Sequence, residues 1–209
     1  RLDAMDLPAD AYDVIAASGD ATQEAMLSGA AGRKLWHLGP GKDEDLFTII
    51  PEWLKDQPSI ERVELDEAEG IICTGPFDEF NETPDDYRAR FLLAKTKGLK
   101  MLCANPDLVV DFGETRIFCA GALAELYEEM GGEVLFFGKP HPPVYDYARR
   151  QLAAKGINID NDAALAIGDG ARTDIRGARA EGIDAVFVTG GLEAQRFGAD
   201  PAHPDADLL

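Results

Sequence analysis

Short apolar runs alternate with longer amphipathic segments along most of the chain. The apolar runs have the length of β-strands, and each stops at a glycine or a polar turn residue. They lie at residues 14–17, 34–38, 70–74, 100–104, 133–137, 163–167 and 185–188. The segments between them predict helices at residues 20–26, 45–54, 84–97, 120–130, 142–155 and 173–181.

The repeated order of strand, glycine-containing loop and helix predicts an α/β fold with parallel strands. In sheets of this kind, binding and catalytic groups gather at the carboxyl ends of the strands. The polar stretch at residues 51–69 is the one segment that we expect to be a flexible connection. The residues that directly follow the predicted strands are therefore the candidates for binding or catalysis.

The acidic excess of the chain narrows the choice of partners. Its 209 residues include 39 Asp and Glu against 20 Lys and Arg, which gives a net charge of −19. A surface of that charge repels nucleic-acid phosphates and anionic lipids, so we expect neither nucleic acid nor membrane as a partner. It would also repel an anionic substrate. A phosphate site would therefore need a metal ion, a lysine or backbone N–H groups close by.

Cys73, Cys103 and Cys119 lie in or near apolar stretches. Their number is odd and no pair has metal-binding or redox spacing, which indicates free thiols in a reducing compartment, here the cytoplasm. No apolar run approaches the roughly 20 residues of a membrane span. The first residues read neither as a signal peptide nor as a natural translation start, so we expect the chain to begin inside a longer protein.

The sharpest chemical signal is the segment Ala-Leu-Ala-Ile-Gly-Asp-Gly-Ala-Arg-Thr-Asp-Ile at residues 164–175. Asp169 directly follows a predicted apolar strand, and Asp174 lies at the start of the next predicted helix. Two carboxylates on one loop form a hard oxygen site of the kind that Mg²⁺ prefers. The alternative is that Asp169 is a turn residue and that Asp174 or Thr173 caps the helix.

Lys139 is the second signal, because it follows an apolar strand and stands between Gly138 and Pro140. A lysine fixed at a strand end can neutralise a phosphoryl group and a carboxylate together. His141 comes next, but the prolines after it favour a turn over a catalytic role. A third apolar strand closes on Asn-Pro-Asp at residues 105–107, where all three residue types also form simple turns.

Taken in this order, the motifs resemble the class IIA branch of the haloacid dehalogenase superfamily, which are phosphatases with an α/β cap of C2 type. The matching segments are residues 13–22, 103–107, 120–123, 138–140 and 168–175. The resemblance implies a three-layer parallel-sheet core, incomplete at the N-terminus, with an inserted C2-type cap. The core would hold residues 1–19 and 134–209, and the cap would hold residues 20–133.

The resemblance also implies roles for individual residues in hydrolysis of a small phosphomonoester through an aspartyl-phosphate intermediate. Asp169 would be a direct Mg²⁺ ligand and Asp174 would support it, directly or through water. Lys139 would orient the nucleophile and bind the transferring phosphoryl group. Asn105 and Asp107 would lie in the cap near the leaving group. The phosphate side of the site would be lined by Gly170, Ala171, Arg172 and Thr173.

The sequence departs from the family pattern at the nucleophile. The family places its nucleophilic aspartate in an Asp-x-Asp-Gly motif before the segment that begins at Asp13, and nothing there fits. Asp160-Asn161-Asp162 has the spacing but lies in a polar loop before a strand. We therefore expect the chain as given to lack the nucleophile and to be inactive by itself.

Two alternatives to an enzyme stay open. One is a nucleotide- or effector-binding module whose loop at residues 168–170 forms a phosphate nest, although neither a Gly-x-Gly-x-x-Gly nor a Walker motif occurs. The other is a degenerate family member without catalysis. The partner expected from the resemblance is a small phosphorylated metabolite, and family caps suggest a homodimer through the cap.

Overall fold

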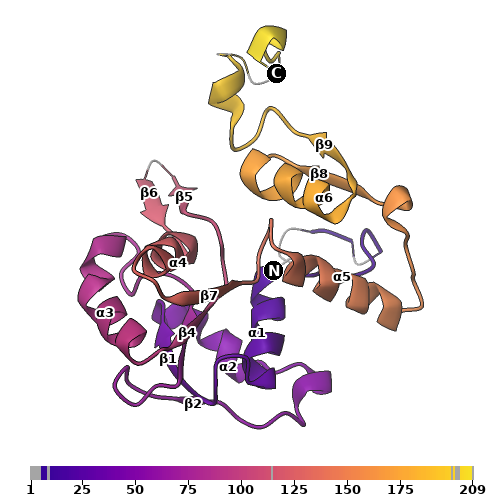
Figure 1. Cartoon of the computed structure of the whole chain (residues 1–209). Coiled ribbons are helices and arrows are strands. Elements are labelled where there is room, and N and C mark those ends of the chain that lie inside the picture. Colours follow the sequence, from indigo (N-terminus) through magenta and orange to yellow (C-terminus); the bar gives the residue numbers. More distant parts are fainter. Residues whose placement is uncertain (1–5, 9, 114, 199, 201–202, 209) are drawn as a thin grey trace. The chain divides into compact units, whose positions relative to one another are not determined.

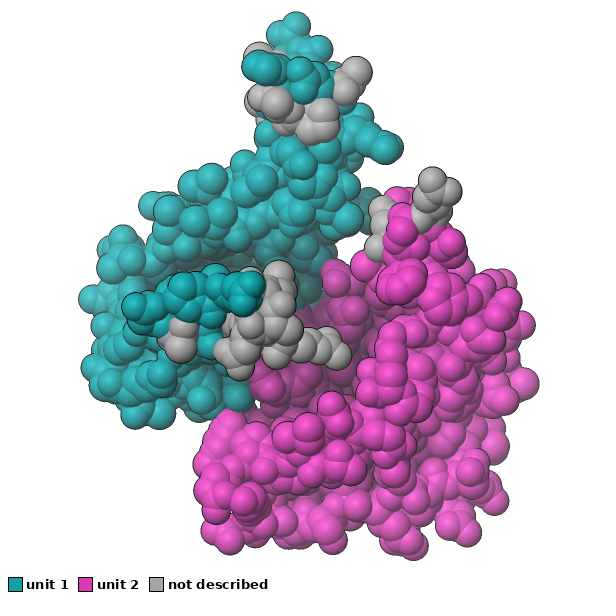
Figure 2. Space-filling view, turned by 180° about the vertical axis from the view of Figure 1, so that it is seen from behind, with its two compact units in different colours: residues 1–16, 139–209 teal, residues 17–138 magenta. Residues whose placement is uncertain are grey.

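A computed structural model describes residues 6–8, 10–113, 115–198, 200 and 203–208, and the chain forms two compact units (Figure 1). One unit holds residues 1–16 and 139–209, and the other holds residues 17–138, as Figure 2 shows in two colours. The sequence predicts boundaries between core and cap at residues 19/20 and 133/134, and these boundaries stay a prediction.

The unit of residues 17–138 is built on a five-stranded sheet in which every neighbouring pair is parallel. Its order is β2–β1–β3–β4–β7. The strands are β1 (Lys34–Leu38), β2 (Glu61–Arg62), β3 (Gly70–Cys73), β4 (Lys100–Cys103) and β7 (Glu133–Phe136). The central strand β3 is buried along its whole length, as expected of a parallel strand that is covered on both faces. The parallel α/β fold predicted from the sequence is confirmed.

Helices cover both faces of this sheet (Figure 1). They are α1 (Ser18–Ser28), α2 (Asp45–Thr48), α3 (Arg88–Thr96) and α4 (Ala120–Glu129), with 3-10 turns at Gly41–Glu44, Glu52–Leu54 and Pro84–Tyr87. The turn before α3 starts where the sequence predicts, because the Asp86 carboxylate accepts the N–H of Thr83 at 2.8 Å and its hydroxyl at 2.9 Å. The first of these bonds satisfies a backbone N–H that the start of a helix leaves open.

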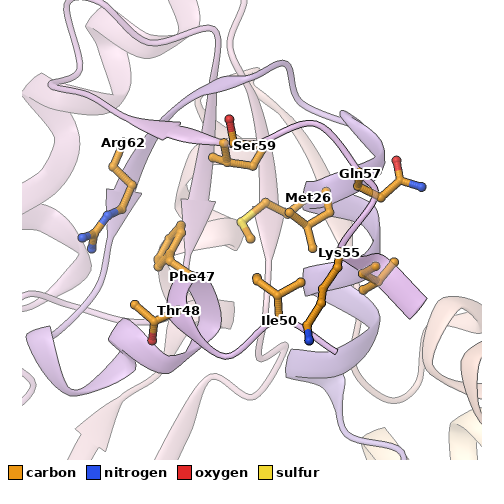
Figure 3. A pocket seen from close by; sticks show the side chains of 11 residues that line it. Met26, Phe47, Thr48, Ile50, Lys55, Gln57, Ser59 and Arg62 are labelled. Atoms are coloured by element: carbon orange, nitrogen blue, oxygen red, sulfur yellow. The ribbon is translucent and has the colours of Figure 1, made fainter. Parts of the chain in front are cut away.

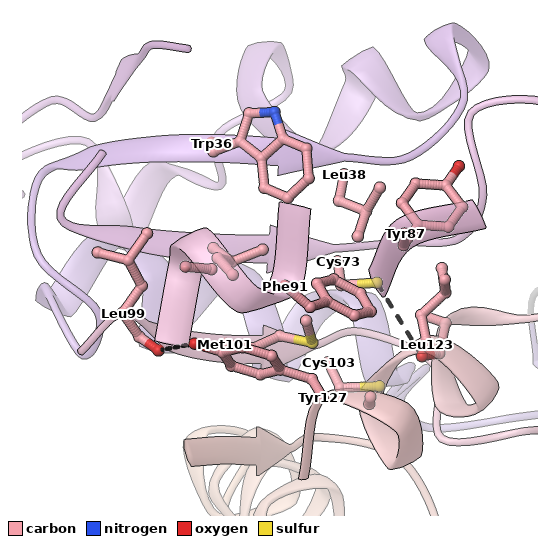
Figure 4. Packing of buried hydrophobic residues seen from close by; sticks show 14 of the residues in the cluster. Trp36, Leu38, Cys73, Tyr87, Phe91, Leu99, Met101, Cys103, Leu123 and Tyr127 are labelled. Atoms are coloured by element: carbon pink, nitrogen blue, oxygen red, sulfur yellow. Dashed lines mark hydrogen bonds between the residues drawn. The ribbon is translucent and has the colours of Figure 1, made fainter. Parts of the chain in front are cut away.

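Aromatic side chains of α3, of the 3-10 turn before it and of α4 fill the space over one face of the sheet (Figure 4). The Phe91 ring stacks on Tyr87 at a centroid distance of 5.9 Å and meets Tyr127 at 5.3 Å. All three side chains are fully buried. The Tyr127 hydroxyl donates to the Leu99 carbonyl at 2.6 Å, so its only polar group is satisfied inside the core.

Two sequence predictions are wrong, and one pair of strands was not predicted. The stretch at residues 51–69 is not a flexible connection, because it contains a 3-10 turn and β2 and buries Leu54, Leu65 and Ala68. Residues 14–17 are not a strand, since a strand exists only through hydrogen-bonded neighbours and no described strand pairs with them. An antiparallel hairpin that the sequence did not predict joins β5 (Val109–Phe112) to β6 (Thr115–Phe118).

The unit of residues 1–16 and 139–209 contains α5 (Pro142–Ala154), β8 (Leu165–Gly168), α6 (Arg176–Glu181) and β9 (Asp184–Phe187). Strands β8 and β9 pair in parallel, with Gly168 opposite Phe187. Helix α5 is held to the end of α6 by Arg149, whose Nη1 donates to Glu181 Oε2 at 2.7 Å. Short 3-10 turns occur at Asn161–Ala163, Ala194–Phe197 and Ala206–Leu208. Across the described part of both units, no helix has the length and apolar character needed to cross a membrane.

Replacing Phe91 with alanine should remove most of the aromatic packing between α3 and α4. We expect Phe91→Ala to lower the free energy of unfolding by about 3–5 kcal/mol, the usual cost of deleting a buried aromatic ring. The adjacent Leu92 is 56% exposed, so Leu92→Ala should change it by less than about 0.5 kcal/mol. Denaturant titration of both variants checks this, and equal losses would contradict the packing described.

The three thiols should be unreactive in the folded protein. Burial raises the pKa of Cys103 to about 12 and that of Cys119 to about 11, and it also raises the pKa of Cys73. Because the thiolate is the reactive form, a thiol-specific disulfide reagent near neutral pH should label none of them quickly. All three should react after unfolding in guanidinium chloride. Rapid labelling of any one before unfolding would show that the core opens there.

Candidate functional site

Asp169 stands directly after β8, at the carboxyl end of the parallel pair. Its Oδ2 accepts the backbone N–H of Leu192 at 2.8 Å, which ties it to the loop that follows β9. That loop approaches closely, because a Cβ added at Gly191 would lie 2.2 Å from Asp169 Oδ2. No other described residue donates a hydrogen bond to the second carboxylate oxygen of Asp169, so that oxygen is available to a ligand.

Asp174 turns back from the following helical turn toward the end of β8. Residues Ala171–Ile175 form a π-helical turn, in which the Gly170 carbonyl accepts the N–H groups of Asp174 at 2.8 Å and Ile175 at 3.2 Å. Asp174 Oδ2 in turn accepts the Gly170 N–H at 3.1 Å. A Cβ added at Gly168 would lie 2.2 Å from Asp174 Cγ, so only glycine leaves room for this carboxylate.

Lys139 and Asp174 form an ion pair between Nζ and Oδ1. The Asp174 side chain is 12% exposed and the Lys139 side chain is 52% exposed, so the pair lies at the edge of the site with its ammonium facing solvent on one side. An ammonium has three donors, and one bond to Asp174 leaves others for an anion. The structure therefore brings together Lys139 and the loop of residues 168–174, two features that the sequence singled out separately.

Glu193 is a residue of this site that sequence reasoning missed. Its Oε1 accepts the backbone N–H of Ala171 at 2.9 Å, and its Oε2 pairs with Arg196. The Ala171 amide, which was predicted to line the phosphate side, thus already has a carboxylate partner. The available signal was the Thr189-Gly190-Gly191 segment directly after β9, because neighbouring parallel strands end at the same edge of a sheet.

The remaining predicted phosphate-side residues belong to the same turn. Gly170 is buried, and Thr173 Oγ1 lies close enough that a Cβ on Gly170 would meet it at 2.2 Å. Arg172 is exposed on the turn. The roles assigned to Gly170, Ala171, Arg172 and Thr173 stay predictions.

The donor set of this loop suits a hard divalent cation. No group of three or more His, Cys, Asp or Glu side chains in the described ranges is arranged to hold a metal. Mg²⁺, however, is usually held by only one or two carboxylates, together with waters and substrate phosphate oxygens. Asp169 and Asp174 supply two carboxylates on one loop, and Asp169 has an oxygen to which none of the described residues donates. The residues present therefore fit such an ion.

Asn105 and Asp107 lie in the other unit, in the turn that follows β4. The Asn105 side-chain oxygen accepts the Asp107 N–H at 3.2 Å, and the Asp107 carbonyl accepts the N–H of Gly121 at the start of α4 at 3.1 Å. These bonds are those of a turn that closes β4 onto α4, so the local geometry is explained without a ligand. The specificity role of both residues stays a prediction.

His141 occupies the residue before the first turn of α5. Partial burial, followed by the positive charge of Arg176, lowers its pKa, which keeps the imidazole neutral near pH 7. Two prolines at the start of α5 fix the backbone after it. These features agree with a position at the entrance of a helix.

Comparison with known proteins leads to one group of hydrolases. A family model described as HAD-hydrolase-like matches residues 136–208. The crystal structure of a haloacid dehalogenase-like hydrolase from Brucella suis 1330 is 38% identical, with a TM-score of 0.77, and the match covers 90% of this chain and 68% of that one. No curated protein gives a significant match.

More distant structures share the fold. A p-nitrophenyl phosphatase from Archaeoglobus fulgidus is 20% identical with a TM-score of 0.57, and the match covers 81% of this chain and 59% of that one. A glycerol phosphate phosphatase from Mycobacterium tuberculosis, in complex with calcium, is 21% identical with a TM-score of 0.60. That match covers 85% of this chain and 48% of the mycobacterial chain. The chain thus spans from about half to about two thirds of the length of these three structures.

The close approach at Gly168 gives a test of the loop geometry. In Gly168→Ala the added methyl would overlap Asp174, so either Asp174 leaves Lys139 or the backbone shifts. We expect the free energy of unfolding to fall by about 1–3 kcal/mol, as for other overpacked sites. Gly19, in the first turn of α1, has open space around it, so Gly19→Ala should be neutral or stabilising by up to about 1 kcal/mol. Equal effects in denaturant titrations would contradict the geometry.

Proposed function

Because the chain belongs to the haloacid dehalogenase-like hydrolase family, we propose that the full-length protein is a Mg²⁺-dependent phosphatase acting on a small phosphomonoester. The observation that carries the proposal is the Lys139–Asp174 ion pair next to Asp169 at the carboxyl end of β8. A lysine and two carboxylates on a glycine-bounded loop combine a fixed positive charge with oxygen donors. That combination suits the transfer of a phosphoryl group.

The two carboxylates share one proposed role, with Asp169 as the direct metal ligand and Asp174 supporting it directly or through water, and Lys139 has another. Asp169 and Asp174 would hold Mg²⁺, which when bound offsets the negative charge of the phosphoryl group. Lys139 would place its ammonium against the same group while its bond to Asp174 keeps the side chain from turning into solvent. The turn of residues 170–173 would form the wall beside the phosphate.

The proposed reaction proceeds in two steps. An aspartate carboxylate attacks phosphorus in line with the leaving alcohol, the P–O bond to that alcohol breaks, and an aspartyl phosphate results. Water then attacks phosphorus, which releases inorganic phosphate and restores the carboxylate. No aspartate of this sequence is assigned the nucleophile, so the residues named here are those that hold and neutralise the phosphoryl group.

The finer assignments extend the same proposal. We infer membership of class IIA, with residues 20–133 as a C2-type cap and with Asn105 and Asp107 influencing which leaving group is accepted. The substrate class is a small phosphorylated metabolite. A cytoplasmic location and a homodimer through the cap complete the proposal, which treats nucleic acids and membranes as unsuitable partners for a chain of charge −19.

The metal assignment can be tested on the full-length protein with p-nitrophenyl phosphate. We expect hydrolysis to stop when EDTA removes divalent cations and to return with Mg²⁺. Asp169→Asn should lower kcat on the order of a hundredfold or more, because the metal's electrostatic contribution amounts to several kcal/mol of barrier.

The matched control is Asp162→Asn, which changes an exposed carboxylate in the polar turn before β8 and should leave the rate unchanged. Undiminished turnover in Asp169→Asn would overturn the metal assignment. Tight nucleotide binding that needs no Mg²⁺, together with no turnover of any phosphomonoester, would instead support the binding-module alternative.

A further inference from the structure

A pocket of about 400 Å³ lies between α1, α2 and the stretch from Ile50 to Arg62 (Figure 3). Its volume is within the range typical of small-molecule sites. It belongs wholly to the unit of residues 17–138 and contains none of Lys139, Asp169 and Asp174. Nothing in the proposed phosphatase function uses it.

The side chains of Gln23 and Arg33 hold the walls of this pocket in place through hydrogen bonds to backbone carbonyls. The Gln23 side chain is almost fully buried, and its Nε2 donates to the carbonyls of Leu46 at 2.8 Å and Ile49 at 2.9 Å. Arg33 Nη1 donates to the carbonyls of Leu27 at 2.6 Å and Pro58 at 3.1 Å. Gln23 of α1 thus holds the end of α2, and Arg33 links the last turn of α1 to the loop before β2. The hollow is therefore preformed, which lowers the entropic cost of filling it.

The inner surface of the pocket is mainly apolar. Figure 3 shows the side chains of Met26, Phe47 and Ile50 arranged around the same space. The apolar lining residues are Met26, Leu27, Phe47, Ile50, Leu54 and Ile60. Such a lining favours a ligand with a flexible hydrocarbon body over a sugar or a nucleotide.

Both charged residues that line the pocket are basic, in a chain where acidic residues outnumber basic ones by 39 to 20. They are Lys55 and Arg62. The Arg62 guanidinium lies 4.8 Å from the centre of the Phe47 ring and pairs with Glu44. Lys55 pairs with Glu52, three residues earlier, and both of these side chains are largely exposed. Exposed pairs of this kind contribute little, so a ligand anion can replace the carboxylate partner.

We propose that this pocket binds an amphipathic monocarboxylate, an unbranched hydrocarbon chain of medium length with one carboxylate. The hydrocarbon chain lies among Met26, Phe47 and Ile50. The carboxylate lies at the rim near Lys55, whose side chain enters the same side of the pocket as Ile50 in Figure 3. This site is independent of the phosphatase proposal, because its residues and its test involve neither Mg²⁺ nor turnover.

Calorimetric titration of the full-length protein with octanoate, below its micelle concentration, tests the proposal directly. We expect saturable binding with one site per chain. Acetate should bind at least about a hundredfold more weakly, because it lacks the methylene groups that would be buried. 1-Octanol should bind about three- to fivefold more weakly than octanoate, since it cannot pair with the Lys55 ammonium.

Binding measurements on three variants test whether the ligand occupies this pocket. Lys55→Gln should weaken octanoate about threefold and leave 1-octanol unchanged. Its matched control is Arg88→Gln, since Arg88 is also 55% exposed and also pairs with an acid three residues earlier, away from the pocket. Arg88→Gln should change neither affinity. Ile50→Trp should abolish binding of both ligands by filling the pocket, with thermal unfolding used to confirm that the variant is folded.

Three results would overturn the proposal. They are absence of saturable octanoate binding, equal losses in Lys55→Gln and Arg88→Gln, and full octanoate affinity in a folded Ile50→Trp. If Ile50→Trp does not fold, the comparison of Lys55→Gln with Arg88→Gln decides the question by itself.

Discussion

The ion pair between Lys139 and Asp174 is the interaction around which the candidate site is organised. In a chain with a net charge of −19, two carboxylates on one loop would repel each other and any anion that approached them. The Lys139 ammonium offsets one carboxylate, and the Gly170 N–H supplies a second favourable contact to it. Leu192 does the same for Asp169 through its backbone N–H. The local field at the end of β8 is thereby made less negative than the composition of the chain would suggest.

A strand could be predicted from sequence where an apolar run ends at a glycine or a turn residue, which holds for the buried β3 and also for the largely exposed β8 and β9. Strands β3 and β4 are short apolar runs bounded by glycine or turn residues, and both are buried in the centre of a parallel sheet. The hairpin β5–β6 escaped prediction because its four-residue strands each contain a charged residue, Asp111 or Arg116, so neither forms an uninterrupted apolar run. The over-predicted strand at residues 14–17 shows the opposite error, since an apolar run carries no information about whether a pairing partner exists. Pairing is a property of the tertiary structure.

The residues of the candidate site also differ in whether the sequence alone revealed them. Lys139, Asp169 and Asp174 could be found because each lies in a short motif whose neighbours reveal its position at a strand end or helix start. Glu193 was missed, because no short motif surrounds it and it reaches Ala171 through the register that sets Phe187 of β9 beside Gly168 of β8. The ordered path of residues 51–69 was also hidden, since its few buried side chains, such as Leu54 and Leu65, are separated by long polar stretches. That path forms the outer wall of the pocket that Gln23 and Arg33 hold in shape.

The strand order of the larger sheet has a consequence for how the protein is made. Strands β1, β3, β4 and β7 stand in the sheet in the order in which they leave the ribosome, and β2 joins the free edge of β1. Each new strand therefore finds its neighbour already synthesised, and each crossover closes a loop of moderate length. The unit of residues 17–138 can assemble outward, one strand at a time, while residues 139–209 are still being translated. Lys139 would then emerge next to a finished unit, with its partner Asp174 still 35 residues away along the nascent chain.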